Sequence, residues 1–466
     1  MSSAREPSPQ VSTGLSDFGY RQELKRALSF KDLLRYGMVA MVPIAPFGVY
    51  GFVAEASQGL VPLAYGLGLL AMVFTALCYA AMAQEFPVAG SAYTYTQRGL
   101  HPLAGFLAGW LLLLDYILVP ALLFVVSANS LQALWPALPG WCWVLAFIAL
   151  CTAINLRGVE LTARANRVFL ALQLLVLAIF MALALWTLLG PGGTGLSLRP
   201  IQGPQLNWNW VAGAAAIAAL SFLGFDAIST LSEEVRSDPA RPHDNPVGRA
   251  TLWVLFLMGS CFIAQTWLAS ELALAAGPDF KPASADSAFY DIAALAGGRS
   301  LFITCAVATA LAWGVANALS AQAAVSRVLY AMARDGQLPG SRWLARVHPE
   351  RQTPQTSTWL VAAVSLAVAL LFLGDAAALT NLVTFGALSA FVLLHLAVIW
   401  HFLLRQRSGR WLRHGLVPAL GLAVLLFILY GQDRAAMKLG LAWLGLGLLW
   451  WATLGRGRHG ALKLAG

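Results

Sequence analysis

Long apolar runs separated by short polar loops dominate this chain. A run of about 20 apolar residues is long enough for an α-helix to cross the hydrocarbon core of a bilayer. The pattern predicts an all-α integral membrane protein with twelve transmembrane helices. We place these helices at residues 36–55, 60–84, 102–130, 139–156, 165–189, 209–231, 248–273, 300–328, 357–373, 377–402, 414–431 and 437–455.

Two of the predicted helices carry interruptions. Residues 43–51 in the first read PIAPFGVYG, and residues 221–226 in the sixth read SFLGFD. Proline lacks a backbone N–H and glycine tolerates unusual dihedral angles, so both sequences favour local unwinding. For the first segment alone, a simple proline kink explains the sequence equally well. The second break favours a ligand site, because unpaired backbone within a bilayer persists only where it lines a protected cavity.

The spacing of the two breaks indicates internal repeats. They lie five helices apart, which predicts two inverted repeats of five helices with a ligand near the membrane midplane between them. The predicted units are a flexible tail at 1–24, repeats at 25–200 and 201–405, and two further helices with the C-terminus at 406–466. Such paired breaks are typical of transporters.

Composition and charge restrict the class and the topology. With 59% hydrophobic and 11% charged residues, the chain is not a soluble enzyme. Of the 30 lysine and arginine residues, 25 fall in the predicted loops and tails on the side of both termini. Positive loops remain in the cytoplasm, so we expect both termini to be cytoplasmic in a multi-pass protein of the cell (inner) membrane. The net charge of +9 belongs to these dispersed loops, so we expect lipid rather than nucleic acid as the surrounding partner.

Rival functional classes find little support. The seven histidines form no clustered catalytic set, and the five cysteines are scattered without a CxxC pair. We therefore expect no enzyme activity, no metal site and no cofactor. The sequence also lacks a repeated pore loop of the kind that forms an ion filter, which disfavours a channel.

Six sequence segments carry a family resemblance. The chain resembles the amino acid–polyamine–organocation transporter superfamily and, within it, is similar to bacterial putrescine importers. The segments, in family order, are FPVAGSAYTY (86–95), LDYILVP (114–120), SFLGFDAISTLSEE (221–234), SRVLYAMARD (326–335), VHPERQTP (347–354) and NLVTFG (381–386). The resemblance implies the leucine-transporter fold, secondary active transport, and a substrate held by the first, third, sixth and eighth helices.

The first break departs from the family pattern in two ways. Amino-acid carriers of this superfamily usually have Gly-Ser/Thr-Gly there, whereas this chain reads Pro46-Phe47-Gly48. Proline has no amide proton and phenylalanine no hydroxyl, so a substrate carboxylate would be poorly bound and an amine is favoured. Putrescine importers commonly have an acidic residue where this chain has Gly48. A polyamine such as putrescine, a related amine, and a neutral or cationic amino acid all stay open as substrates.

Two carboxylates lie well inside predicted helices. A charge at mid-bilayer costs on the order of 3 kcal/mol on insertion scales, so Asp115 and Asp226 are functional candidates. We assign Asp226, beside Gly224, the primary electrostatic contact with a substrate ammonium. Asp115, followed by Tyr116, is assigned a supporting or proton-coupling role. For Asp115, a purely structural role in holding helices together is the alternative.

The remaining candidates surround the breaks and the coupling positions. Phe222, Phe225 and Tyr50 could cover a ligand or make cation–π contacts, and the resemblance places an aromatic gate near Phe222. Several proton-coupled relatives carry a lysine where this chain has Gln173, so we do not expect proton coupling through such a lysine, and proton and sodium both stay open as the coupling ion. The full predicted set is Ile44, Ala45, Phe47, Gly48, Tyr50, Asp115, Tyr116, Ser221, Phe222, Gly224, Phe225 and Asp226 for substrate, and Gln173, Glu85 and Ser320 for coupling or gating. We expect the carrier to work without an accessory subunit.

Overall fold

The structure is a computed structural model that describes residues 28–86, 91–157, 160–202, 206–235, 246–334, 341–344, 346 and 354–454. Its helices in the first half are α1 (Phe30–Met41), α2 (Ala45–Ser57), α3 (Val61–Glu85), α4 (Ser91–Gly99), α5 (Pro102–Gln132), α6 (Gly140–Arg157), α7 (Glu160–Leu189), α8 (Trp208–Phe222) and the 3₁₀ helix η2 (Asp226–Glu234). The second half contains α9 (Pro246–Ala275), α10 (Ala288–Leu311), η3 (Ala312–Asn317), α11 (Ala318–Arg334), α12 (Ser341–Leu344), α13 (Gln355–Leu371), α14 (Ala376–Val398), η4 (Ile399–Arg405), η5 (Leu412–Leu416), α15 (Val417–Gly431) and α16 (Arg434–Leu454).

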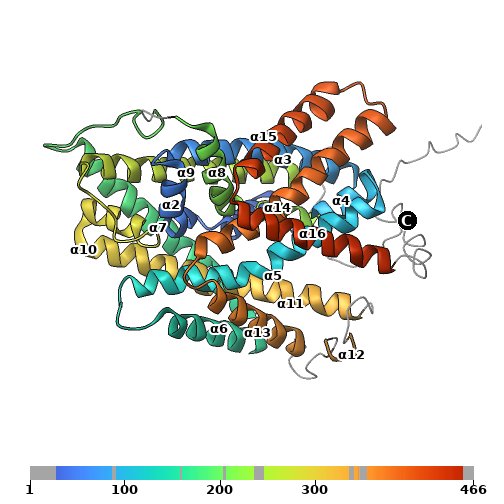
Figure 1. Cartoon of the computed structure of the whole chain (residues 1–466), viewed down its shortest axis with the longest axis horizontal. Coiled ribbons are helices and arrows are strands. Elements are labelled where there is room, and N and C mark those ends of the chain that lie inside the picture. The colour runs from blue at the N-terminus through green and yellow to red at the C-terminus, as the bar shows by residue number, and fades with distance from the viewer. Residues whose placement is uncertain are drawn as a thin grey trace, which may run out of the picture.

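The long helices form one bundle. Figure 1 shows α3, α5 and α9 running roughly along the long axis of the molecule, with α6 and α13 along one side and α15 on the other. The short helices α4 and α12 lie at the same end of the bundle as the last turns of α16. Because α3 packs on α8 and α9, and α14 on α5, elements from the two halves of the chain interleave through the core.

The helix inventory supports a multi-pass membrane protein. Within the described residues, eight helices are long and apolar enough to cross a membrane, and α1 with α2 forms a ninth span bent by 47°. The shorter apolar helices Gly140–Leu156, Trp208–Phe222 and Gln355–Leu371 coincide with the remaining predicted spans. Each predicted span thus overlaps a helix, and the all-α class is confirmed.

The first helix is broken, and the break lies nearer its N-terminus than the sequence suggested. The break covers Val42, Pro43 and Ile44, whereas Pro46 sits in the first turn of α2, where its missing N–H is tolerated. The helix bends by 47° at this break, and the Phe47 amide, which would be the α-helical partner of the Pro43 carbonyl, bonds to the Ile44 carbonyl at 3.0 Å instead. The side-chain amide of Gln265 in α9 donates to the Pro43 carbonyl at 3.1 Å, so a neighbouring helix satisfies the freed backbone group.

The second break follows α8. Phe222 ends the α-helix, Gly224 has φ of +106°, and the chain resumes as the 3₁₀ helix η2 at Asp226. A side chain at position 224 would place its Cβ 2.8 Å from the Ala40 carbonyl oxygen. Glycine is therefore required both for its backbone angle and for its close approach to α1. The predicted span 209–231 is helical throughout its first part and tightens into 3₁₀ geometry after the break.

One helix was missed by the hydropathy pattern. The predicted eighth span begins at residue 300, but α10 begins at Ala288 and changes direction at Gly298, where φ is +64°. Residues 288–297 combine buried Phe289, Tyr290 and Ile292 with partly buried positions and the exposed Leu295. Their apolar run is shorter than a membrane span, so hydropathy alone assigned this segment to a loop.

The bond between Gln265 and Pro43 predicts a specific stability effect. Replacing Gln265 by Leu leaves the Pro43 carbonyl unpaired within the bundle, and an unpaired buried group costs about 1–3 kcal/mol. We expect a lower apparent melting temperature for purified Gln265→Leu in detergent. Thr266→Val is the matched control, since Thr266 bonds only to carbonyls of its own helix. Equal melting temperatures for the two variants would contradict this role for Gln265.

Candidate functional site

A cavity of about 1000 Å³ lies beside the two breaks. It is bounded by α1, α2, α5, α7, α8, η2, η3 and α11. Asp115 and Leu123 of α5 both line it and lie eight positions apart on the helix, so the cavity extends for about 12 Å along α5. At the α1 end it reaches Arg35, whose largely exposed side chain pairs with Asp32 at 3.5 Å. This end of the cavity therefore opens toward solvent.

Two carboxyl groups lie in the same cavity. The side chain of Asp115 is 7% exposed, and Asp226 is partly buried at the start of η2. The Gly224 amide donates to Asp226 Oδ1 at 3.3 Å, which ties this carboxylate to the break. Such a pair attracts a cation into the cavity.

An aromatic cluster of Phe47, Phe180 and Phe289 closes the α2 side of the first cavity. The ring of Phe47 in α2 stacks on Phe289 in α10 with a centroid distance of 3.9 Å, and Phe180 of α7 contacts both rings. All three side chains are at most 1% exposed. Outside the cluster, Asn129 of α5 donates to Asp286 Oδ1 at 2.6 Å, just before α10 begins. The N-terminal part of α10 is thus held against α2, α5 and α7.

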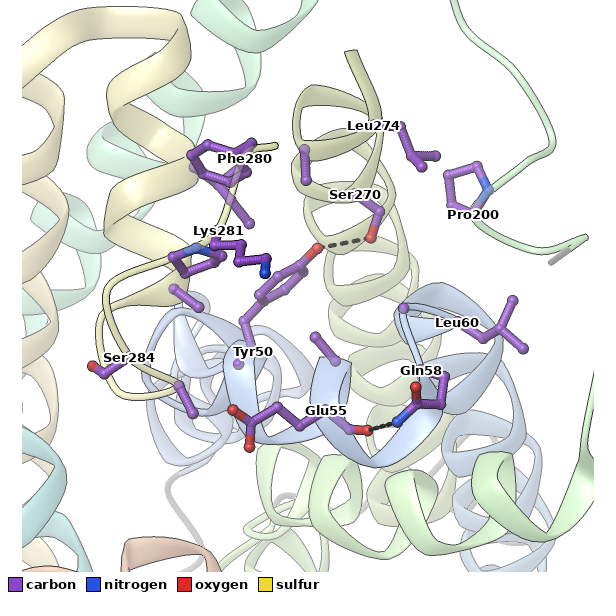
Figure 2. Close-up of a pocket in the computed structure, with 18 of the residues that line it drawn as sticks. Tyr50, Glu55, Gln58, Leu60, Pro200, Ser270, Leu274, Phe280, Lys281 and Ser284 are labelled. Carbon is purple, nitrogen blue, oxygen red and sulfur yellow. Dashed lines mark hydrogen bonds between the residues drawn. The ribbon is translucent and has the colours of Figure 1, made fainter. Parts of the chain in front are cut away.

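A second cavity of about 1140 Å³ lies on the far side of this cluster. Figure 2 shows this vestibule, in which the Tyr50 hydroxyl and Ser270 Oγ are joined by a hydrogen bond of 2.9 Å. Glu55, Lys281 and Arg199 also line it, and all three are exposed. Because Tyr50 lies here and Ala45 lines the other cavity, the Phe47 ring marks the boundary between the two.

The structure brings about half of the predicted residues into the first cavity. The predicted residues that line it are Ala45, Asp115, Tyr116, Gln173, Gly224, Asp226 and Ser320. The predicted residues that do not line it are Ile44, Phe47, Gly48, Tyr50, Ser221, Phe222, Phe225 and Glu85. Both expected carboxylates are therefore in the first group, whereas most of the expected aromatic side chains are in the second.

The aromatic residues next to the second break pack between helices. Phe222 contacts Phe262 with a centroid distance of 5.3 Å, and Ser221 bonds to the Tyr65 hydroxyl at 2.9 Å. Phe225 packs against Phe391 at 5.7 Å. These side chains hold α8 and the break against α3, α9 and α14 in this conformation.

Glu85 lies apart from the cavity, at the end of α3. Its Oε1 accepts a hydrogen bond of 2.6 Å from the Gln406 side chain, and His401 Nε2 lies 3.4 Å from the same oxygen. These contacts join α3 to the region after α14.

Sequence reasoning missed Phe180, Phe289 and Trp313. The first two form the aromatic closure, and Trp313 lines the first cavity from the π-helix η3. Aromatic residues are frequent in membrane helices, and no local motif separates these three from ordinary packing residues. Only the convergence of α2, α7, α10 and η3 identifies them.

Comparison with known proteins identifies the family. The model of a family described as "Amino acid permease" matches residues 35–436. The chain belongs to the amino acid permease family. It is therefore a membrane transporter of the amino acid–polyamine–organocation superfamily and not an enzyme, which confirms both predictions.

Three curated relatives cover nearly the whole permease. The chain is 32% identical to the low-affinity putrescine importer PlaP of Escherichia coli (strain K12), over 93% of this chain and 94% of that protein. It is 28% identical to the branched-chain amino acid permease BcaP of Bacillus subtilis (strain 168), over 92% of each chain. A methylthioribose transporter of the same organism is also 28% identical, over 92% of this chain and 93% of that one.

The aromatic closure of the permease leads to a testable prediction. Phe289→Ala removes the ring stacked on Phe47, and such ring pairs contribute about 0.5–1.5 kcal/mol beyond their buried area. We expect faster amide hydrogen exchange in residues 288–297. Leu295→Ala, a truncation at a more exposed position of the same segment, is the control. Unchanged exchange in Phe289→Ala would show that the ring stack does not hold this segment.

Proposed function

We propose that this permease is a secondary active transporter that moves a small organic amine across the membrane by alternating access. The amine is a polyamine such as putrescine or a related amine. Transport is driven by an ion gradient, with proton or sodium as the coupling ion, or by exchange. The observation that carries the proposal is the position of Asp115 and Asp226 in one cavity beside both helix breaks.

The asymmetry of the two cavities supports alternating access. The cavity with the carboxylates reaches solvent past Arg35, while the cluster of Phe47, Phe180 and Phe289 separates it from the vestibule around Tyr50. In alternating access, a carrier closes the barrier on one side of its substrate site while the other side is open, and then reverses the two. Opening the aromatic cluster and closing the α1 end would expose the same carboxylates to the other side.

The geometry of the first break favours an amine over a carboxylate-bearing solute. Helix N-termini bind anions through free backbone N–H groups. In α2, however, the Ala45 and Phe47 amides already donate to the Val42 and Ile44 carbonyls, and Pro46 has no N–H. The first three residues of α2 therefore offer no free amide to a substrate carboxylate.

An amino acid is the second candidate substrate. The relatives named as branched-chain amino acid permeases support it, since they match nearly the whole chain. The relative named as a putrescine importer is more similar and supports the amine. Uptake assays with both substrate classes separate these two functions.

The finer topology belongs to the same proposal. We propose twelve spans in a leucine-transporter-like arrangement, with inverted repeats at 25–200 and 201–405 and two further helices at 406–466. Both termini face the cytoplasm from the inner membrane, and the carrier works without an accessory subunit. In Figure 1, α4, α12 and the last turns of α16 lie at one end of the bundle, which supports a common membrane side for these three elements.

Removal of the Asp226 charge tests the proposed function. Deleting one partner of a buried charge pair costs about 2–5 kcal/mol, so Asp226→Asn should lower kcat/KM for amine uptake by at least about 30-fold. The measurement is radiolabelled putrescine uptake into proteoliposomes, with and without a proton or sodium gradient. Asp279→Asn, which removes an exposed loop carboxylate, should transport normally. Equal uptake by both variants would refute the role of Asp226.

A further inference from the structure

Four exposed arginines gather where α14 and η4 turn back into η5 and α15. We call residues 405–413 the arginine hairpin, and its arginines are Arg405, Arg407, Arg410 and Arg413. The sequence contains no Asp or Glu between Asp375 and Asp433, so the two helices of this hairpin supply no counter-charge. Like charges that lie this close along the chain repel one another unless an anion lies among them.

The neighbouring helix α3 does not pair with these arginines through a carboxylate. Glu85 at its end accepts a hydrogen bond of 2.6 Å from Gln406 and lies 3.4 Å from His401. Arg413 donates to the neutral Gln84 Oε1 at 3.3 Å. Among the residues that the structure describes, none of the four guanidinium groups forms an ion pair with a carboxylate. The hairpin therefore carries its positive charges without a paired counter-ion.

Contacts across the hairpin hold its backbone in one shape. Phe402 of η4 stacks on His414 of η5 with a centroid distance of 4.1 Å. Ser408 Oγ and His414 Nδ1 are joined by a hydrogen bond of 2.9 Å, and the Ser408 amide donates to the Phe402 carbonyl at 2.8 Å. Side chains on a fixed turn lose less conformational freedom when they bind a common ligand. The arginine hairpin is thus preorganised for an anion.

The hairpin lies at the level of the lipid head groups. The two candidate membrane spans beside it, Ala376–Arg405 and Leu412–Gly431, leave only residues 406–411 between them. The first span has 30 residues, which at the helical rise is about 45 Å and matches a bilayer with its head groups. In Figure 1 this orange hairpin projects from the upper edge of the bundle, at the end where α4 lies. The guanidinium groups are therefore within reach of phospholipid phosphates.

Exposed apolar side chains adjoin the arginines. Trp411 is 60% exposed, Leu412 57% and Leu404 59%. Tryptophan is enriched at the boundary between head groups and acyl chains, and leucine favours the acyl layer. A soluble phosphate would leave these side chains in water, whereas a phospholipid would cover them and also supply the anion. A phospholipid is the occupant that fits both features.

A general topology signal does not require this arrangement. The bias of positive charge toward one side of a membrane depends on how many Lys and Arg residues the short loops contain. It needs neither a rigid turn nor exposed apolar residues beside the charges. The exposed Arg342 and Arg346, in and just after α12, supply such charges in another loop and offer a matched comparison.

We propose that the arginine hairpin binds an anionic phospholipid through its phosphate group. Arginine can form two parallel hydrogen bonds to a phosphate, so several of these side chains share one head group. Trp411 and Leu412 lie against the glycerol and the upper acyl chains of the same lipid. Because Gln406 bonds to Glu85, the bound lipid also stabilises the contact between the hairpin and the end of α3. This site belongs to the scaffold of the permease and does not depend on the substrate.

Competition between two lipids tests the proposal. Delipidated wild-type protein in a nonionic detergent is mixed with equimolar phosphatidylglycerol and phosphatidylcholine that carry the same acyl chains, and bound lipids are counted by native mass spectrometry. We expect phosphatidylglycerol adducts to exceed phosphatidylcholine adducts at least about tenfold, since each surface arginine contributes about fivefold toward anionic lipid. Equal adducts of the two lipids would overturn the proposal.

Two double variants locate the site. Arg407→Gln/Arg410→Gln removes two charges from the hairpin, so the preference for phosphatidylglycerol should fall at least about fivefold. Arg342→Gln/Arg346→Gln removes the same charge from the loop around α12 and should keep the preference. An equal fall in both variants would show a general attraction to positive loops and would refute the hairpin site. If the first double variant does not fold, Arg407→Gln is compared with Arg342→Gln in the same way.

Inorganic phosphate separates a lipid site from a site for a soluble anion. At equal phosphorus concentration, phosphatidylglycerol should raise the melting temperature of wild-type protein by at least about 2 °C relative to phosphatidylcholine, because a ligand of the folded state stabilises it. Inorganic phosphate should leave the melting temperature unchanged. No shift with phosphatidylglycerol, or an equal shift with phosphate, would contradict the lipid proposal.

Discussion

Backbone polarity inside a membrane is the constraint on which this structure depends. A helix that crosses a bilayer can stop only where its freed N–H and C=O groups find other partners. Here the first break pairs the Ala45 and Phe47 amides within its own turn and the Pro43 carbonyl with Gln265 of α9. The second break continues as a 3₁₀ helix, and its Gly224 amide bonds to Asp226. The cavity exists because both breaks are satisfied without filling the space between them.

Buried acids in this permease differ in how fully they are paired. Glu271 is 3% exposed, and its Oε1 accepts from both the amide and the hydroxyl of Ser197 at 2.8 Å. That carboxylate anchors the segment after α7 to α9. Asp115 is similarly buried, yet its Oδ1 has no partner among the described residues. The contrast distinguishes a carboxylate that stabilises the fold from one that is available to a ligand.

The closed side of the molecule is assembled from residues that are distant in sequence. Phe47, Phe180 and Phe289 come from α2, α7 and α10, and their rings meet only because residues 288–297 turn back over α2. The open side instead presents α1 and α11 around the carboxylates. Gly298, with φ of +64°, separates the residues that carry Phe289 from the helix that continues into η3.

Hydropathy and motif by themselves determined the membrane class, the positions of the apolar helices, the two interrupted helices and the two intramembrane carboxylates. These features can be read along the sequence alone, because they depend on the length of apolar runs, the backbone properties of Pro and Gly, and the high cost of a buried charge. The sequence did not determine which side of a helix faces the cavity. Phe222 and Phe225 pack between helices, whereas Trp313 reaches the cavity and Phe289 closes its far side. Only tertiary structure decided these placements, because in helices that are apolar on every face the hydrophobic pattern carries no direction, and neighbouring helices select the face that remains open.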